Sequence, residues 1–427
     1  MRPGRLVQNA IALMVSSGGT AVIGVIFWVV AARLASTAAV GRTTAEIAAM
    51  LLLANLAQLS YGSIFERFLP VAGRFTRQFV TRAYVLCVAF AFVLGIAYLL
   101  LGLGHHFIPA SLGWRVLFVA AVVLWTIFAL EDSVLIGLRA SRIVAIENIA
   151  YSIAKLALLP ACVLLSASQG IFVATTSPLL LTVAAVTWYL FRKRIPDHMA
   201  VDRPAEALPS TRELIVLAGA QYTALLSGVF MPSLLSIIVI ERLGPVANAH
   251  FFLPNMIVIS LGLFAWSIVR SFLVEASHEP GELRIHANSA LRALIVVLVP
   301  SVTLGCIFAP EILGLFGPSY AAYGTTLMRM LLVSLLGTAV MVFYSTFAWL
   351  DKRVWWMTAR NLVGSLVQLV VVLLLIGHFG IVSIGIAALA NSAISFSIFI
   401  PISIRRYRLT AVPAGTGADD ETPVADE

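Results

Sequence analysis

Long apolar runs follow one another along the whole chain and are separated by short polar segments. Twelve can be delimited: about 8–32, 43–65, 81–103, 114–137, 143–165, 170–191, 213–240, 246–273, 290–312, 325–350, 355–377 and 380–404. Each is about 20–28 residues long, the length that an α-helix needs to cross a bilayer, and none alternates like a membrane strand. The pattern predicts an all-α polytopic membrane protein with about 12 transmembrane helices. The first run is too long for a signal peptide and is expected to remain as a helix.

Composition supports this class. Of the 427 residues, 60% are hydrophobic and only 11% are charged, whereas soluble domains carry roughly 25% charged residues. The net charge of +8 is not a sign of nucleic-acid binding here, because Lys and Arg of membrane proteins gather in cytoplasmic loops. With twelve spans and a cytoplasmic N-terminus, 21 of the 28 basic residues fall inside, four outside and three within spans. This asymmetry predicts that both termini are cytoplasmic.

A polar segment divides the runs into six and six. We expect an N-terminal lobe (1–191), a cytoplasmic linker (192–212) that contains three prolines, and a C-terminal lobe (213–408). The remaining residues, 409–427, are acidic and rich in small residues, which predicts a disordered tail.

Motifs for chemistry are missing from the sequence. It contains no GxxxxGK[ST], HExxH or GxSxG, no spaced His/Cys cluster, and no outer loop long enough for a catalytic domain. The three cysteines, Cys87, Cys162 and Cys306, lie inside apolar runs without CxxC spacing. We therefore expect neither an enzyme nor a cofactor, and no metal site.

Ionisable residues within spans are costly and usually face a bundle interior or a hydrated cavity. The fourth and fifth runs hold Glu131, Asp132, Glu147 and Lys155. They form either a charge cluster that locks these two helices together or a site for ion coupling or substrate contact.

Two further sets are candidates for substrate contact. Asn55, Gln58 and Tyr61 follow one another at helical spacing, so they form one polar stripe that either bonds a neighbouring helix or lines a hydrated cavity. In the second half, the polar candidates are Gln221, Tyr222 and Asn255. Arg33, Arg67 and Arg270 lie at helix ends, where they either reach the lipid headgroups or bind a phosphate or acidic sugar.

Segments of both halves resemble a known family. The segment LFGPSYAAYGTTLMRMLLVSLLGTAVMVFYSTFAWLDKR (315–353) resembles the hallmark of polysaccharide exporters, and AARLASTAAVGR (31–42) and ERLGPVANAHFFLPNMI (241–257) resemble that family's Arg-Leu-Gly-Pro rim. The family is that of the Wzx-type polysaccharide flippases of the multidrug/oligosaccharidyl-lipid/polysaccharide exporter superfamily. The first rim departs from it in reading Ala-Ser-Thr. The chain also has no room for the two additional helices of the related lipid II flippases.

The resemblance implies two six-helix lobes around a cavity that opens alternately to either side of the plasma (inner) membrane. It implies a flippase that moves an isoprenoid-linked oligosaccharide for cell-surface polysaccharide biosynthesis, with glycan polymerases or glycosyltransferases as possible partners and no nucleic acid. A multidrug and toxin extrusion exporter of amphiphilic cations is the alternative, and a membrane scaffold without transport is a third class.

Overall fold

The computed structural model describes residues 3–200, 231–278, 282–350 and 354–409. This part of the chain is helical throughout and contains no strand. Nine of its helices are long and apolar enough to cross a membrane, and Gly19–Leu34 and Val382–Ile398 are shorter apolar stretches. Each of the twelve predicted ranges overlaps a helix, which confirms the all-α polytopic membrane class.

The first half of the chain forms one bundle, which we call the N-bundle. Its helices are α1 (Pro3–Leu34), α2 (Thr37–Ala57), α3 (Tyr61–Phe68), α4 (Thr76–Leu100), α5 (Leu112–Gly137), α6 (Ser141–Leu165), α7 (Gly170–Tyr189) and α8 (Ile195–Met199). Two 3₁₀ turns, Leu69–Val71 and Gly73–Phe75, join α3 to α4, and a π-helical turn, Leu190–Arg194, joins α7 to α8.

The second half forms the C-bundle. Its described helices are α10 (Met231–Leu243), α11 (Pro245–His278), α12 (Leu283–Ile307), α13 (Ala309–Gly314), α14 (Pro318–Leu350), α15 (Val354–Phe379) and α16 (Val382–Leu409). Large aliphatic side chains are exposed along α12 and α15, including Val296, Leu366 and Leu374. Such a surface suits contact with lipid tails.

Two boundaries differ from the predicted ones. The second apolar run, predicted as 43–65, is broken after Ala57, because Leu59 and Ser60 have left-handed φ angles of 48° and 61° that a continuous helix cannot contain. The chain also stays helical from α7 to Met199, past the predicted start of the linker at 192. The rest of that linker (201–212) and the tail (410–427) lie outside the described residues.

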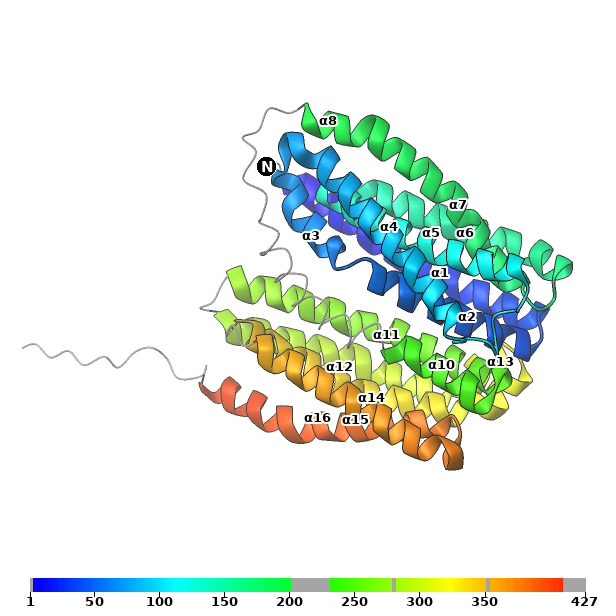
Figure 1. The fold of residues 1–427 in the computed structure, drawn as a ribbon. Coiled ribbons are helices and arrows are strands. Elements are labelled where there is room, and N and C mark those ends of the chain that lie inside the picture. Colours follow the sequence, from blue (N-terminus) through cyan, green and yellow to red (C-terminus); the bar gives the residue numbers. More distant parts are fainter. Residues whose placement is uncertain (1–2, 201–230, 279–281, 351–353, 410–427) are drawn as a thin grey trace, which may run out of the picture.

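The two bundles lie side by side at one end and spread apart toward the other (Figure 1). We call the first the closed end: α1 ends there, α2 and α11 begin there, and α10 and α13 end there. We call the second the open end, where α3 and α8 lie. Connections at the closed end are short, since only Ala35 and Ser36 separate α1 from α2 and only Gly244 separates α10 from α11.

Candidate functional site

A buried asparagine of the C-bundle joins the bundles at the closed end. Asn248, in the second turn of α11, is 0% exposed. Its amide nitrogen donates to the Gly41 carbonyl oxygen at 2.8 Å and to Thr44 Oγ1 at 3.0 Å, both on α2. Its Oδ1 accepts a hydrogen bond from Ser236 Oγ of α10 at 2.8 Å. One side chain therefore connects three helices of the two bundles.

The same place brings two backbones into close contact. A Cβ built on Gly41 would lie 1.7 Å from the carbonyl oxygen of Pro245, the first residue of α11. Only glycine can stand at position 41 while α2 and α11 are this close.

An arginine holds a second pair of elements together. Arg33, in the last turn of α1, donates from Nε to the Leu315 carbonyl oxygen and from Nη2 to the Gly314 carbonyl oxygen, each at 2.8 Å. These carbonyls end α13, where helical carbonyl groups lack partners within the helix and attract cations. In this conformation two donors of Arg33 serve the contact between bundles.

A histidine of the N-bundle and a carboxylate of the C-bundle also approach each other at the closed end. His106, in the loop between α4 and α5, lies 3.2 Å from Glu241 of α10, measured between Nε2 and Oε2. This ion pair and the hydrogen bonds of Asn248 and Arg33 are polar contacts that join the two bundles. A hydrogen bond contributes roughly 0.5–1.5 kcal/mol net, so the four bonds hold this end by about 2–6 kcal/mol, which still permits reversible opening.

The predicted polar stripe lies at the break that ends α2. Asn55 donates from Nδ2 to the Leu51 carbonyl oxygen at 2.7 Å and accepts from Gln58 Nε2 at 3.4 Å. Tyr61 begins α3, and its ring packs against Phe65 and Phe79. All three side chains of the stripe are half-buried.

The other predicted substrate contacts lie on α11 and at the open end. Asn255 is half-buried next to Pro254, and Arg270 is exposed toward the end of α11. Arg67, at the end of α3, is also exposed, with its guanidinium 5.3 Å from the Phe68 ring centroid. Gln221 and Tyr222 lie outside the described residues.

Opposite charges from the two bundles approach each other near the open end. Partial burial raises the pKa of Glu66 on α3, and the positive charge of Arg270 on α11 counteracts that rise. Among the described residues the two side chains form no ion pair. They are close enough to interact through the electrostatic field but not in contact.

Three predicted carboxylates come together inside the N-bundle. Glu131 on α5 is 0% exposed, and its Oε1 accepts a hydrogen bond from Thr187 of α7. Asp132 accepts from Asn148 Nδ2 at 3.2 Å on both oxygens. Glu147 on α6 is buried, neither of its oxygens has a hydrogen-bond partner in the described structure, and it lies within electrostatic range of the other two.

Lys155 does not neutralise this cluster. It lies two turns beyond Glu147 on α6, with Nζ 5.1 Å from the Phe27 ring centroid and 5.2 Å from that of Tyr151. No ion pair joins Lys155 to a carboxylate in the part of the chain that the structure describes. A buried carboxylate without a cationic partner is stable only when it is protonated or holds a cation.

Sequence reasoning missed most of the closed end. Gly41, Thr44 and Glu241 act there only through partners on the other half of the chain, about 130–200 residues away. The one local signal is Asn248, an asparagine inside an apolar run.

Comparison with known proteins identifies the fold. No family model and no curated protein sequence matches the chain. The solved structure of a multidrug-resistance MATE-family transporter of the MOP superfamily in its inward-facing conformation superposes with a TM-score of 0.64 at 16% identity, over 94% of this chain and 100% of that one. An outward-facing MATE structure gives 0.60 at 15% identity, covering 96% of each chain.

A third structure extends the comparison within the superfamily. It is a MOP-superfamily transporter from Pyrococcus furiosus, described by a binding pocket of reverse polarity that suggests a different function, with a TM-score of 0.59 at 15% identity over 95% of this chain and 96% of that one. These solved structures belong to the superfamily that the sequence resembles, and their likeness to this chain is one of fold. The chain has the fold of the MATE transporters of the MOP superfamily.

Proposed function

We propose that this protein is a flippase that moves an isoprenoid-linked oligosaccharide, or a related glycolipid, across the plasma membrane by alternating access. The distribution of basic residues assigns the open end to the cytoplasm and the closed end to the outside. The described conformation is then inward-facing. Substrate would enter at the open end, and rupture of the closed-end contacts would release it outside.

The chemistry of the two helices that meet between the bundles supports this substrate. From Asn55 to Tyr61 the chain offers uncharged polar groups, and α11 offers Asn255 and Ser260. Neither 47–65 nor 245–274 contains a carboxylate. Arg67 lies just beyond the first stretch, next to Glu66, and Arg270 lies near the end of the second, both toward the open end. A neutral hydrogen-bonding row with cationic groups at its end suits a sugar head attached to a phosphate. This arrangement is the observation that carries the proposal.

The proposed separation of head and tail follows from solvation. A sugar with many hydroxyl groups cannot cross hydrocarbon, because each unpaired polar group costs several kcal/mol. Polar side chains between the bundles would replace water around the head, while the isoprenoid tail stays in lipid between them. The membrane itself is therefore a partner in transport.

The carboxylate cluster supplies a route for coupling. Glu147 and Oε2 of Glu131 have no hydrogen-bond partner among the described residues, so they suit uptake of a proton or a sodium ion. Binding of the ion would change the charge inside the N-bundle and thereby bias one of the two conformations.

Mass spectrometry of polyprenyl-linked glycans in lipid extracts tests the proposal. Cells that lack the protein should accumulate one lipid-linked glycan and lose the corresponding surface polymer. Wild-type protein should reverse both effects, and a variant with Arg67→Ala and Arg270→Ala should not. Matched substitution of two exposed arginines at the closed end, Arg115→Ala and Arg242→Ala, should leave the reversal intact.

An ion-coupled exporter of amphiphilic cations is the second candidate. It is favoured by the buried carboxylates of the N-bundle and by the similarity to structures of multidrug MATE transporters. In that case no lipid-linked glycan changes on loss of the protein, and cells retain cationic dyes instead.

A further inference from the structure

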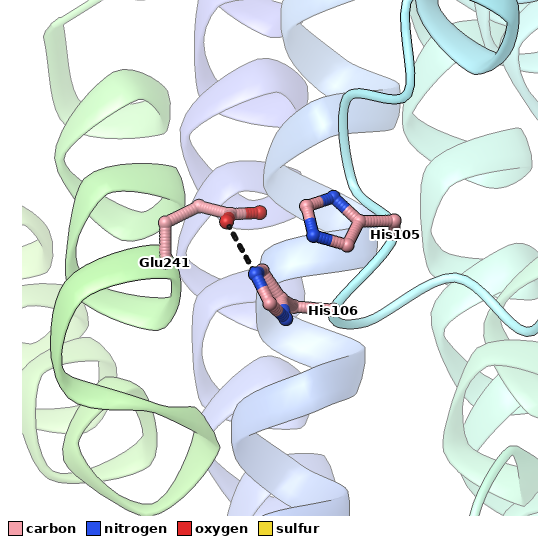
Figure 2. Close-up of side chains that lie close together, drawn as sticks. All are labelled: His105, His106 and Glu241. Atoms are coloured by element: carbon pink, nitrogen blue, oxygen red, sulfur yellow. Dashed lines mark ion pairs between the residues drawn. The ribbon is translucent and has the colours of Figure 1, made fainter.

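Two histidines and a glutamate from different bundles converge at the closed end (Figure 2). His105 and His106 lie in the loop between α4 and α5, and Glu241 lies in the last turn of α10. One ligand atom from each residue can be chosen so that all three atoms lie within 4.8 Å of one another. The two imidazole ring centroids are 3.8 Å apart, and both rings point toward the carboxylate.

The loop that carries the histidines is firmly anchored. Gly102 and Gly104 have φ angles of 70° and 81°, which make its sharp turns, and the following Phe107 and Ile108 are buried. The amides of Phe107 and Ile108 both donate to the Gly104 carbonyl oxygen, at 3.0 and 2.8 Å. The two imidazoles are therefore presented by a fixed turn that is anchored on both sides.

One imidazole is already oriented as a metal ligand. His105 Nδ1 lies 2.9 Å from the Gly102 carbonyl oxygen. Because a carbonyl can only accept, this nitrogen carries the hydrogen, and the lone pair is on Nε2. Metal-bound histidines typically use this arrangement, with the second nitrogen donating to a backbone carbonyl.

The donor set fits a divalent transition metal. Two imidazoles and one carboxylate form a three-ligand zinc site that leaves one position for water. Zinc bonds of about 2.0–2.1 Å place ligand atoms roughly 3.3 Å apart, close to the 3.2 Å that separates His106 Nε2 from Glu241 Oε2. The side chain of His106 is 53% exposed and that of Glu241 is 29% exposed, so an ion can reach the site from solvent.

We propose that His105, His106 and Glu241 form a binding site for Zn²⁺ or a similar divalent transition metal, and that the bound ion holds the closed end shut. Two ligands belong to the N-bundle and one to the C-bundle, so separation of the bundles divides the site. Zinc then binds the conformation with a shut closed end preferentially and multiplies the ratio of shut to open molecules by 1 + [Zn²⁺]/Kd. A bound ion that holds the closed end shut should also inhibit transport, and this consequence rests on the proposed alternating access, whereas metal binding itself does not depend on the proposed substrate.

Calorimetric titration of the purified full-length protein with ZnCl₂ tests the site. We expect one ion per chain, and a Kd that rises at least tenfold for each of the variants His105→Ala, His106→Ala and Glu241→Gln. His378→Ala, which removes an exposed histidine at the end of α15, should bind like the wild type. Zinc binding that is absent, or equal in all five proteins, would overturn the site.

A distance measurement tests the closure separately. Spin labels at Leu165 (α6) and Phe379 (α15), both exposed and both at closed-end helix termini, form what we call the closed-end label pair. They are introduced after replacement of the three native cysteines. Zinc should narrow the distance distribution to its shorter component, and EDTA should reverse this. If zinc binds through the three residues but leaves the distances unchanged, the ion does not hold the closed end shut, although the metal site stands. Neither result depends on the identity of the transported substrate.

Discussion

The Pro245 carbonyl oxygen occupies the position that a side chain at residue 41 would need, since a Cβ on Gly41 would be 1.7 Å from it. Two helices from opposite halves of the chain thus meet backbone to backbone. The contact requires no charge and no large side chain. It depends on the absence of a side chain at Gly41.

Replacement of Gly41 by alanine should open the closed end. A carbon and an oxygen need roughly 3.0–3.5 Å, so α2 and the start of α11 would separate by about 1–2 Å and lose the Asn248 hydrogen bonds. The closed-end label pair should then report longer distances. Gly24→Ala is the matched control, because a Cβ there meets nothing within 4 Å. Unchanged distances in Gly41→Ala would contradict this packing.

Replacement of Arg33 should weaken the same end by a different route. Alanine removes both hydrogen bonds to the carbonyls that end α13, which costs about 1–3 kcal/mol and shifts the conformational equilibrium roughly 5- to 150-fold. Lysine can serve only one of the two carbonyls at a time and should give an intermediate shift. Arg115→Ala, an exposed arginine at the same end of the N-bundle, should leave the label distances as they are.

Glu147→Gln tests ion coupling. Glutamine has the shape of a protonated glutamate, so the thermal unfolding midpoint should not fall, while transport driven by a proton or sodium gradient should lose that dependence. Uptake into proteoliposomes with and without an imposed gradient measures this effect. Glu311→Gln, an exposed carboxylate on α13, is the control. Gradient-driven transport by Glu147→Gln at the wild-type level would exclude Glu147 from coupling.

Glu66 and Arg270 should form an ion pair when the open end closes. They already interact electrostatically across the gap between α3 and α11. Glu66→Arg places like charges there and should shift the equilibrium away from closure of this end roughly 2- to 5-fold, as should Arg270→Glu; spin-label distances across the open end measure the shift. Because exchange of the two charges restores the attraction, the double variant should recover most of the closure. Recovery that fails, although both single variants fold, would argue against the pair.

The helices were predictable from hydropathy alone, because lipid demands long apolar segments whatever the fold. The break after Ala57 was not, since neither Leu59 nor Ser60 is a helix breaker. The break accompanies close packing of α3 on α5, where the Phe65 carbonyl oxygen would be 2.6 Å from a Cβ at Gly137, and this contact joins residues about 70 positions apart in the sequence.

The candidate site also has one part that could be predicted from the sequence and one part that could not. Glu131, Asp132 and Glu147 could be grouped from sequence, because the helices that carry them are consecutive and joined by a short turn. The zinc site could not, because His106 and Glu241 are 135 positions apart, and the sequence predicted no metal site at all. Apart from Asn248, the residues that join the bundles have no local signal in the sequence, because their partners lie in the other half of the chain.

The left-handed turn at Leu59 and Ser60 has a consequence for energetics. It separates α2, whose first turns are held by Asn248 of the C-bundle, from α3, which is packed on α5 of its own bundle. Asn55 and Gln58 lie directly before this turn. A ligand that binds them therefore acts on the junction between α2, which is bonded to the C-bundle, and α3, which is packed within the N-bundle. Thermodynamic linkage then makes the effect reciprocal: whatever factor such a ligand applies to the opening equilibrium, opening applies to the ligand's affinity.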